Sequence, residues 1–145
     1  MSVRLETFTT SVNVSTDALW AVVGDLWRLP EWTDVESVAD VDPDPPVVGT
    51  QVETVEAGTM RRWRVVTWER RLFEITTTTE RGGFSVGCRV VRDARGGSRL
   101  VLATQADTPG FAGALRGQLF TAPSLRRRMD RWAAAAMRVA ATTPG

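Results

Sequence analysis

The sequence predicts an α+β fold, with one seven-stranded antiparallel sheet, two short helices after the first strand and a long C-terminal helix. Three observations support it. Short segments of alternating apolar and polar residues recur at regular spacing between turn residues. A capped apolar stretch follows the first of them, and the chain closes on an apolar stripe at helical spacing. A length of 145 residues suits a single domain, which we expect to span residues 1–145.

The first strand and the two short helices follow one another directly. Residues 4–14 alternate apolar and polar side chains, which is the two-residue period of a half-buried strand. Ser15 is placed to cap a helix whose apolar stripe lies within residues 19–23. Gly24 and Asp25 end this helix, and residues 26–32 are expected to form a second, shorter one.

Six further strands are predicted downstream. A proline-rich break at residues 42–46 ends the first of them, because proline has no N–H to donate to a strand ladder. Turns rich in glycine, arginine and aspartate separate the others, and this regular spacing predicts an antiparallel meander. The expected strands are residues 33–41, 49–56, 60–68, 71–79, 84–92 and 98–106.

The C-terminal segment predicts a long amphipathic helix from Leu125 onward. Residues 110–120, which three glycines weaken as a helix, are expected to form a lead-in segment or a flap over one end of the sheet. The apolar stripe of the long helix consists of Leu125, Met129, Trp132, Ala136 and Val139.

Histidine, tyrosine and lysine are absent from the chain. Imidazole bases, phenolic acids and Schiff-base lysines are therefore excluded, and so is the commonest metal ligand. Cys88 is the only cysteine, which excludes an intramolecular disulfide and disfavours a zinc site built on thiolates. We expect no metal and no cofactor. No apolar run is long enough to span a membrane, and a cytoplasmic location is the default expectation.

Charge is distributed unevenly along the chain, although the net charge is only +1. Residues 1–58 carry 11 acids and 2 arginines, whereas residues 59–145 carry 6 acids and 16 arginines. The arginines are spread over several elements and form no nucleic-acid motif, so we do not expect nucleic-acid binding. A solvated face or self-association as a homodimer is the preferred interpretation.

Several motifs, in order, resemble the polyketide cyclase/dehydrase and START-like (SRPBCC) superfamily. Val12 to Trp20 is similar to its strand and first helix, and Asp25 to Trp32 to its linker ending in Pro-x-Trp. Val48-Gly49, Arg62-Trp63-Arg64-Val65 and the segment from Gly97 to Leu102 resemble later strand motifs. The resemblance covers nearly the whole chain through the order and spacing of these motifs.

This resemblance implies a helix-grip fold, in which the sheet curves around the C-terminal helix and encloses a hydrophobic cavity. The implied ligand is an apolar small molecule such as a polyketide, a lipid or an aromatic metabolite. Fold does not settle function, so three alternatives stay open. The protein is a non-enzymatic carrier or sensor, a polyketide cyclase, aromatase or dehydratase, or an interaction module.

Arg61 is the charged residue best placed to touch a ligand. If Trp63 and Val65 face inward, the two-residue period of a strand places Arg61 and Thr67 on the cavity side and sends Trp68 outward. A guanidinium can hold a carboxylate or stabilise an enolate by paired hydrogen bonds. Arg61 is therefore a candidate catalytic residue.

Four acids are candidates for proton transfer, and inward-facing residues of several elements are candidates for lining the cavity. Glu53 and Asp107 are the preferred proton-transfer groups, with Glu56 and Asp25 as weaker candidates and the facing of residues 49–56 left open. Cys88 is interpreted as a small buried hydrophobe rather than a nucleophile. The predicted ligand-binding residues are Trp32, Trp63, Val65, Phe73, Ile75, Phe84, Val86, Cys88, Leu102, Thr104, Leu119 and Met129.

Overall fold

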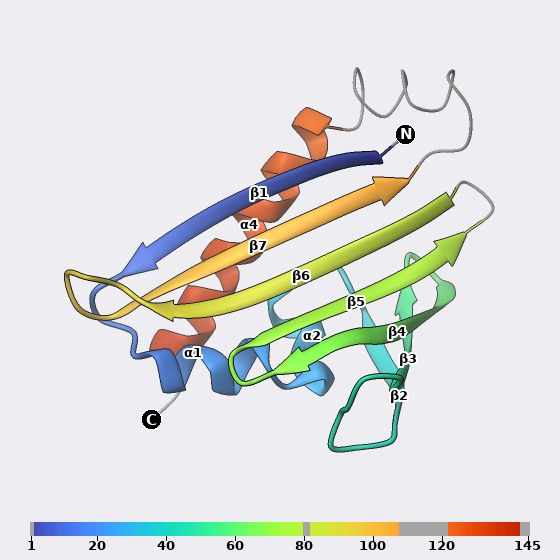
Figure 1. The fold of residues 1–145 in the computed structure, drawn as a ribbon, viewed down its shortest axis with the longest axis horizontal. Coiled ribbons are helices and arrows are strands. Elements are labelled where there is room, and N and C mark those ends of the chain that lie inside the picture. The colour runs from blue at the N-terminus through green and yellow to red at the C-terminus, as the bar shows by residue number, and fades with distance from the viewer. Residues whose placement is uncertain (1, 80–81, 108–121, 143–145) are drawn as a thin grey trace.

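The computed structural model describes residues 2–79, 82–107 and 122–142. The predicted strands and helices are present, with bounds that differ by a few residues, and the expected lead-in segment at 110–120 lies outside the described residues (Figure 1). The elements are β1 (Ser2–Ser11), α1 (Thr16–Val23), the short 3-10 helix η1 (Leu26–Arg28), α2 (Leu29–Trp32), β2 (Ser37–Asp42), β3 (Gln51–Glu56), β4 (Thr59–Glu69), β5 (Leu72–Thr79), β6 (Gly82–Arg92), β7 (Ser98–Asp107) and α4 (Ala122–Thr142).

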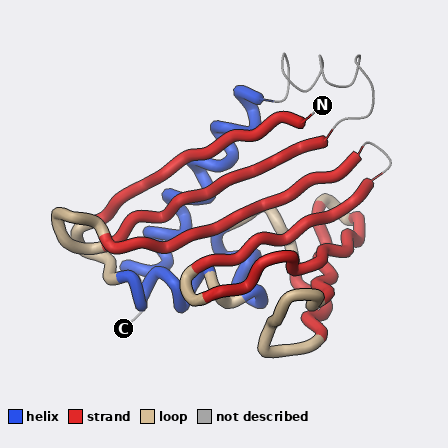
Figure 2. Tube along the Cα trace, in the orientation of Figure 1, coloured by secondary structure: helices blue, strands red, loops and turns tan. Residues whose placement is uncertain are grey.

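The seven strands form one antiparallel sheet in the order β1-β7-β6-β5-β4-β3-β2. Strands β1 and β2, consecutive among the strands, therefore lie at opposite edges. The chain crosses between these edges through α1, η1 and α2, on the same side of the sheet as α4 (Figures 1 and 2). Helix α4 contacts β1, β7, α1 and α2, so the predicted helix-grip architecture is confirmed.

Local side-chain bonds explain where the short helices begin and end. The Ser15 hydroxyl accepts the backbone N–H of Ala18 at 3.0 Å, which satisfies one of the free donors at the start of α1. Gly24 caps the other end of that helix. The Asp25 carboxylate then accepts the N–H of Trp27 at 3.1 Å and starts η1. The predicted break at Gly24 and Asp25 is thus confirmed.

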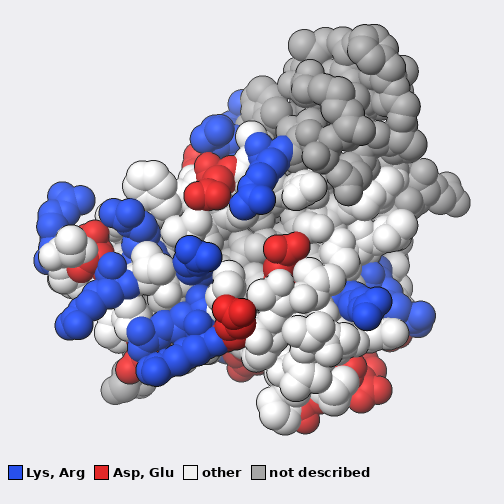
Figure 3. All heavy atoms as spheres, in the orientation of Figure 1, with Lys and Arg blue, Asp and Glu red and all other residues white. Residues whose placement is uncertain are grey.

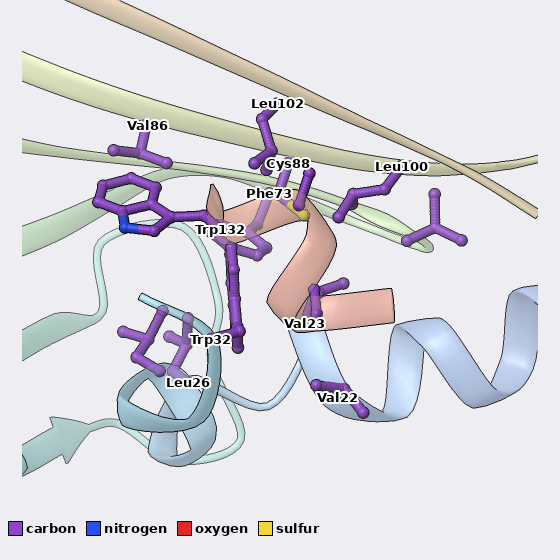
Figure 4. Packing of buried hydrophobic residues seen from close by; sticks show 14 of the residues in the cluster. Val22, Val23, Leu26, Trp32, Phe73, Val86, Cys88, Leu100, Leu102 and Trp132 are labelled. Carbon is purple, nitrogen blue, oxygen red and sulfur yellow. The ribbon is translucent and has the colours of Figure 1, made fainter. Parts of the chain in front are cut away.

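The hydrophobic core lies between the sheet and the helices (Figure 4). Leu100, Leu102 and Phe73 on the strands are fully buried, as are Leu19 and Met129 on the helices. The predicted apolar stripe of α4 is buried except for Val139, which is partly buried. None of the described helices is both long and apolar enough to cross a membrane.

A β-bulge in β4 reverses the facing of the strand beyond Val65. Val65 pairs with Ile75, but Thr67 pairs with Glu74 and Trp68 with Phe73, so one extra residue is inserted. The prediction that Thr67 faces inward and Trp68 outward was therefore wrong. Trp68 lies on the inner face, where its ring stacks on Phe73 with centroids 5.8 Å apart.

The hairpin between β6 and β7 packs closely against the chain that follows β1. Gly97 adopts φ +78°, and a Cβ at this position would lie 2.6 Å from Val12 Cα and would also meet the Ser11 carbonyl oxygen. Gly96 has φ +96°, but a Cβ there would meet no atom within 4 Å. Both positions need a left-handed backbone, and only Gly97 also needs the missing side chain.

Replacing Gly97 by alanine should destabilise the fold much more than replacing Gly96. Gly96→Ala adds only the left-handed backbone penalty, about 1–2 kcal/mol. Gly97→Ala adds a clash with backbone that cannot move aside, and should lower the free energy of unfolding by about 3 kcal/mol or more. Urea unfolding followed by circular dichroism measures both. Equal losses would contradict the close approach of this hairpin to Val12.

Candidate ligand-binding site

A pocket opens between the inner face of strands β3–β6 and the helices α2 and α4. The cavity volume is about 50 Å³, and the cavity opens to solvent at its mouth. Its walls come from six elements and the loop after α2. The lining residues are Leu29, Trp32, Thr33, Asp34, Val35, Glu56, Arg61, Trp63, Phe73, Ile75, Phe84, Val86, Arg128 and Trp132.

Aromatic rings make up much of the wall. Trp63 meets Phe84 edge to face, with centroids 6.1 Å apart and an interplanar angle of 65°. The Trp63 Nε1–H donates to Thr54 Oγ1 at 3.1 Å. Since Thr54 is fully buried beside it, this bond fixes the orientation of the indole. Four aromatic residues besides Trp63 line the same space, which suits a flat apolar ligand.

The charged lining residues stand in two partly exposed ion pairs. Arg61 lies 3.4 Å from Glu56, and Arg128 lies 3.3 Å from Asp34. Asp34 also accepts from Arg131 at 2.8 Å, and this third arginine is exposed and outside the lining. All four lining side chains keep between 24% and 43% of their surface exposed, so they form a rim rather than a floor.

Two indole nitrogens of the wall have no acceptor. Trp32 and Trp132 are 2% and 7% exposed, and the Nε1 of each is buried without a hydrogen-bond partner among the residues the structure describes. In Figure 4 the nitrogen edge of Trp132 points away from Val86 on the sheet. A buried donor with no partner is uncommon in folded proteins and needs an explanation.

The structure brings seven of the predicted site residues to this pocket. The seven are Arg61, Trp32, Trp63, Phe73, Ile75, Phe84 and Val86. Five others are buried but do not line it: Val65, Cys88, Leu102, Thr104 and Met129. Thr104 donates to the Met129 sulfur at 3.2 Å, which ties β7 to α4. Leu119 lies outside the described residues.

Of the two preferred acids, Glu53 faces away from the pocket, and the side chain of Asp107 is outside the described part of the chain. Glu53 alternates with the buried Val52 and Thr54, and it pairs with the exposed Arg62 at 3.0 Å on the other face of the sheet. Asp107 ends β7 opposite Ser2, and its side chain is outside the description. Glu56, whose facing the sequence left open, is the candidate acid that the structure places in the described pocket lining, together with Asp34, which was not predicted.

The residues that the predictions missed come from α2, the loop after it and α4. Arg128 and Trp132 are four residues apart on α4, and Leu29, Trp32 and Thr33 are three to four apart around α2. Such spacing places side chains on one helical face, and this was the available signal. The missed lining residues are Leu29, Thr33, Asp34, Val35, Arg128 and Trp132.

Acids of residues 1–58 pair with arginines of residues 59–145 within one molecule. Asp17 bonds Arg71, and Asp34, Glu53 and Glu56 each pair with arginines of the later half, as given above. Other arginines lie exposed on the outer face of the sheet, shown in blue in Figure 3. A homodimer stays a prediction.

The described residues hold no group of three acids or cysteines that could bind a metal.

The comparisons with known proteins agree with this architecture. Residues 6–140 match the model of a family described as polyketide cyclase / dehydrase and lipid transport. No curated protein matches the sequence.

Solved structures with low sequence identity share the fold. A Staphylococcus aureus protein of unknown function, SA2116, superposes with a TM-score of 0.75 at 10% identity, over 98% of this chain and 95% of that one. Ara h 8.0201 gives 0.69 at 15% identity, over 96% and 98%. Norcoclaurine synthase from Thalictrum flavum gives 0.67 at 15% identity, over 99% and 88%. At such identities the likeness concerns the fold alone.

Cys88 should not react with alkylating agents in the folded protein. The thiol is 1% exposed, and burial raises its pKa, so it stays protonated and covered at neutral pH. Alkylation by iodoacetamide at pH 8 should be at least about 100-fold slower in the folded than in the urea-unfolded chain. Intact mass spectrometry measures both, with a Val66→Cys variant as the exposed control. Fast labelling of folded wild-type protein would show that Cys88 is accessible.

Proposed function

The chain belongs to the polyketide cyclase / dehydrase and lipid transport family, and from that premise we propose that its pocket binds an apolar, ring-containing small molecule as a carrier or sensor. The observation that supports this most directly is the pocket wall. Aromatic and aliphatic side chains from β4, β5, β6, α2 and α4 surround one space, and the charges lie at its rim. Ligand pockets in proteins commonly combine such apolar walls with a few polar groups.

The placement of ionisable groups favours binding over acid–base catalysis. A general acid or base has to come within hydrogen-bond reach of the reacting atom. The ionisable residues among the described lining are Glu56, Asp34 and their arginines, all of them partly exposed. Deeper in the pocket the described lining offers indole, phenyl and aliphatic groups, which position a molecule but do not exchange protons with it.

A polyketide cyclase or dehydratase is the second candidate, and the contact between Arg61 and Glu56 supports it. The guanidinium lies 3.4 Å from the carboxylate, and both line the pocket. In such an enzyme Arg61 would stabilise an enolate while Glu56 moved a proton. Asp107 stays a candidate for proton transfer. Glu53 is not carried forward, because it faces away from the pocket.

Native mass spectrometry separates the two candidates. The protein is incubated with aromatic polyketides, fatty acids and sterols, and the mass of each bound molecule is compared with its starting mass. A carrier or sensor retains ring compounds unchanged, whereas loss of water from a bound polyketide would establish the second candidate. Absence of binding throughout would overturn the proposed function.

Phe84→Ala should weaken binding of an aromatic ring compound, for which 9-fluorenone serves as the probe, whereas Phe8→Ala should not. Phe84 lines the pocket and contacts Trp63, so its loss removes an aromatic contact of about 1 kcal/mol and binding should fall roughly 5- to 10-fold. Phe8 is 63% exposed and does not line the pocket, which makes it the matched control. Isothermal titration calorimetry measures the affinities. Equal effects of the two substitutions would place the binding site elsewhere.

A further inference from the structure

The polar groups of the pocket wall differ in whether they already have hydrogen-bond partners. The Thr33 hydroxyl donates to the Leu29 carbonyl at 2.7 Å and accepts the Val35 N–H at 3.2 Å. The Trp63 indole N–H is held by Thr54. Among the described side chains of the wall behind the rim, the unpartnered polar atoms are the indole nitrogens of Trp32 and Trp132. Both are donors, and an indole has no acceptor to offer.

The rings that carry these two donors line the pocket, although the nitrogens themselves are buried. Trp32 comes from α2 and Trp132 from α4, and both rings border the same unfilled space. A buried N–H without an acceptor is unfavourable, because it has lost its hydrogen bond to water and gained none in return. A molecule that brings an acceptor atom into the pocket would recover that loss, while one without an acceptor would leave it in place.

The rim argues against a charged ligand. Each guanidinium of the lining already faces a carboxylate, since Arg61 pairs with Glu56 and Arg128 with Asp34. A bound carboxylate would lie close to Glu56 and Asp34, and their negative charges would repel it. Arg131 adds a positive charge beyond the lining, but its side chain is 63% exposed and therefore well screened by water.

We propose that the ligand is an uncharged ring compound that carries a carbonyl oxygen, and that the indole N–H of Trp32, of Trp132 or of both donates to this oxygen. The inference rests on the proposed function, because it names the chemical class that the same pocket takes. Both nitrogens are shielded from water and the cavity volume is about 50 Å³, so binding requires the indole rings and the wall beside them to shift enough to admit the ligand and its oxygen. Trp32 and Trp132 are then the residues that select carbonyl compounds over hydrocarbons.

The test compares 9-fluorenone with fluorene, which have nearly the same shape and differ by the carbonyl oxygen. Calorimetry on the wild-type protein should show fluorenone binding about 3- to 10-fold more tightly, the gain expected of one hydrogen bond. Trp132→Phe and Trp32→Phe each remove one N–H and keep an aromatic ring, and the preference for fluorenone should fall in at least one of them. Trp63→Phe is the matched control. It also loses an indole of the wall, but that N–H is already bonded to Thr54, so both affinities should fall and their ratio should stay.

Each outcome decides something different. If neither compound binds, the proposed function fails. If both bind wild-type protein equally well, or if the ratio survives in both variants, the carbonyl inference fails while the proposed function stands. Tighter binding of fluorene-9-carboxylate than of fluorenone would overturn the inference that the ligand is uncharged. Should a variant not fold, the wild-type protein still answers through nuclear magnetic resonance. Fluorenone, but not fluorene, should move one or two indole N–H proton signals downfield, and unmoved signals would overturn the inference.

Discussion

The wide separation of β1 and β2 is the constraint on which the rest of the molecule depends. These strands are consecutive, yet they form opposite edges of a seven-stranded sheet. The chain between them has to cross the full width of the sheet, and it does so through α1, η1 and α2. This crossing places α2 against α4 and both opposite the strands. The pocket is the space that these layers leave at one end of the core.

The sequence predicts elements well here because each has a local cause. Ser15 caps α1, Asp25 starts η1, and the alternation of apolar residues marks the strands. The inward face of β4 is also predictable as far as Val65, since it follows from the period of two. Beyond Val65 a single β-bulge exchanges the faces of the sheet on which Thr67 and Trp68 lie. No local signal in the sequence marks this bulge.

Whether an inward-facing side chain lines the pocket or belongs to the packed core is harder to predict than which face of the sheet it lies on. Cys88, Leu102 and Met129 face inward as expected but belong to the packed core, whereas Phe84 and Val86 on neighbouring positions reach the pocket. A strand's alternation tells which face a side chain is on, but not whether another element fills the space opposite. The contribution of Arg128 and Trp132 depends on how α4 crosses the sheet, which is a property of the assembled layers.

The six tryptophans fall into distinct surroundings, which makes the molecule a natural optical reporter. Trp32, Trp63 and Trp132 line the pocket. Trp20 and Trp68 lie 5.8 Å apart and contact the pocket-lining Phe73 without lining the pocket themselves. Trp27 is exposed, and its nitrogen donates to Asp44. The indoles of the first group would lie against a chromophore bound in the pocket. Excitation energy absorbed by these indoles can therefore pass to an occupant of the pocket over the shortest distances available in the protein, with no added label.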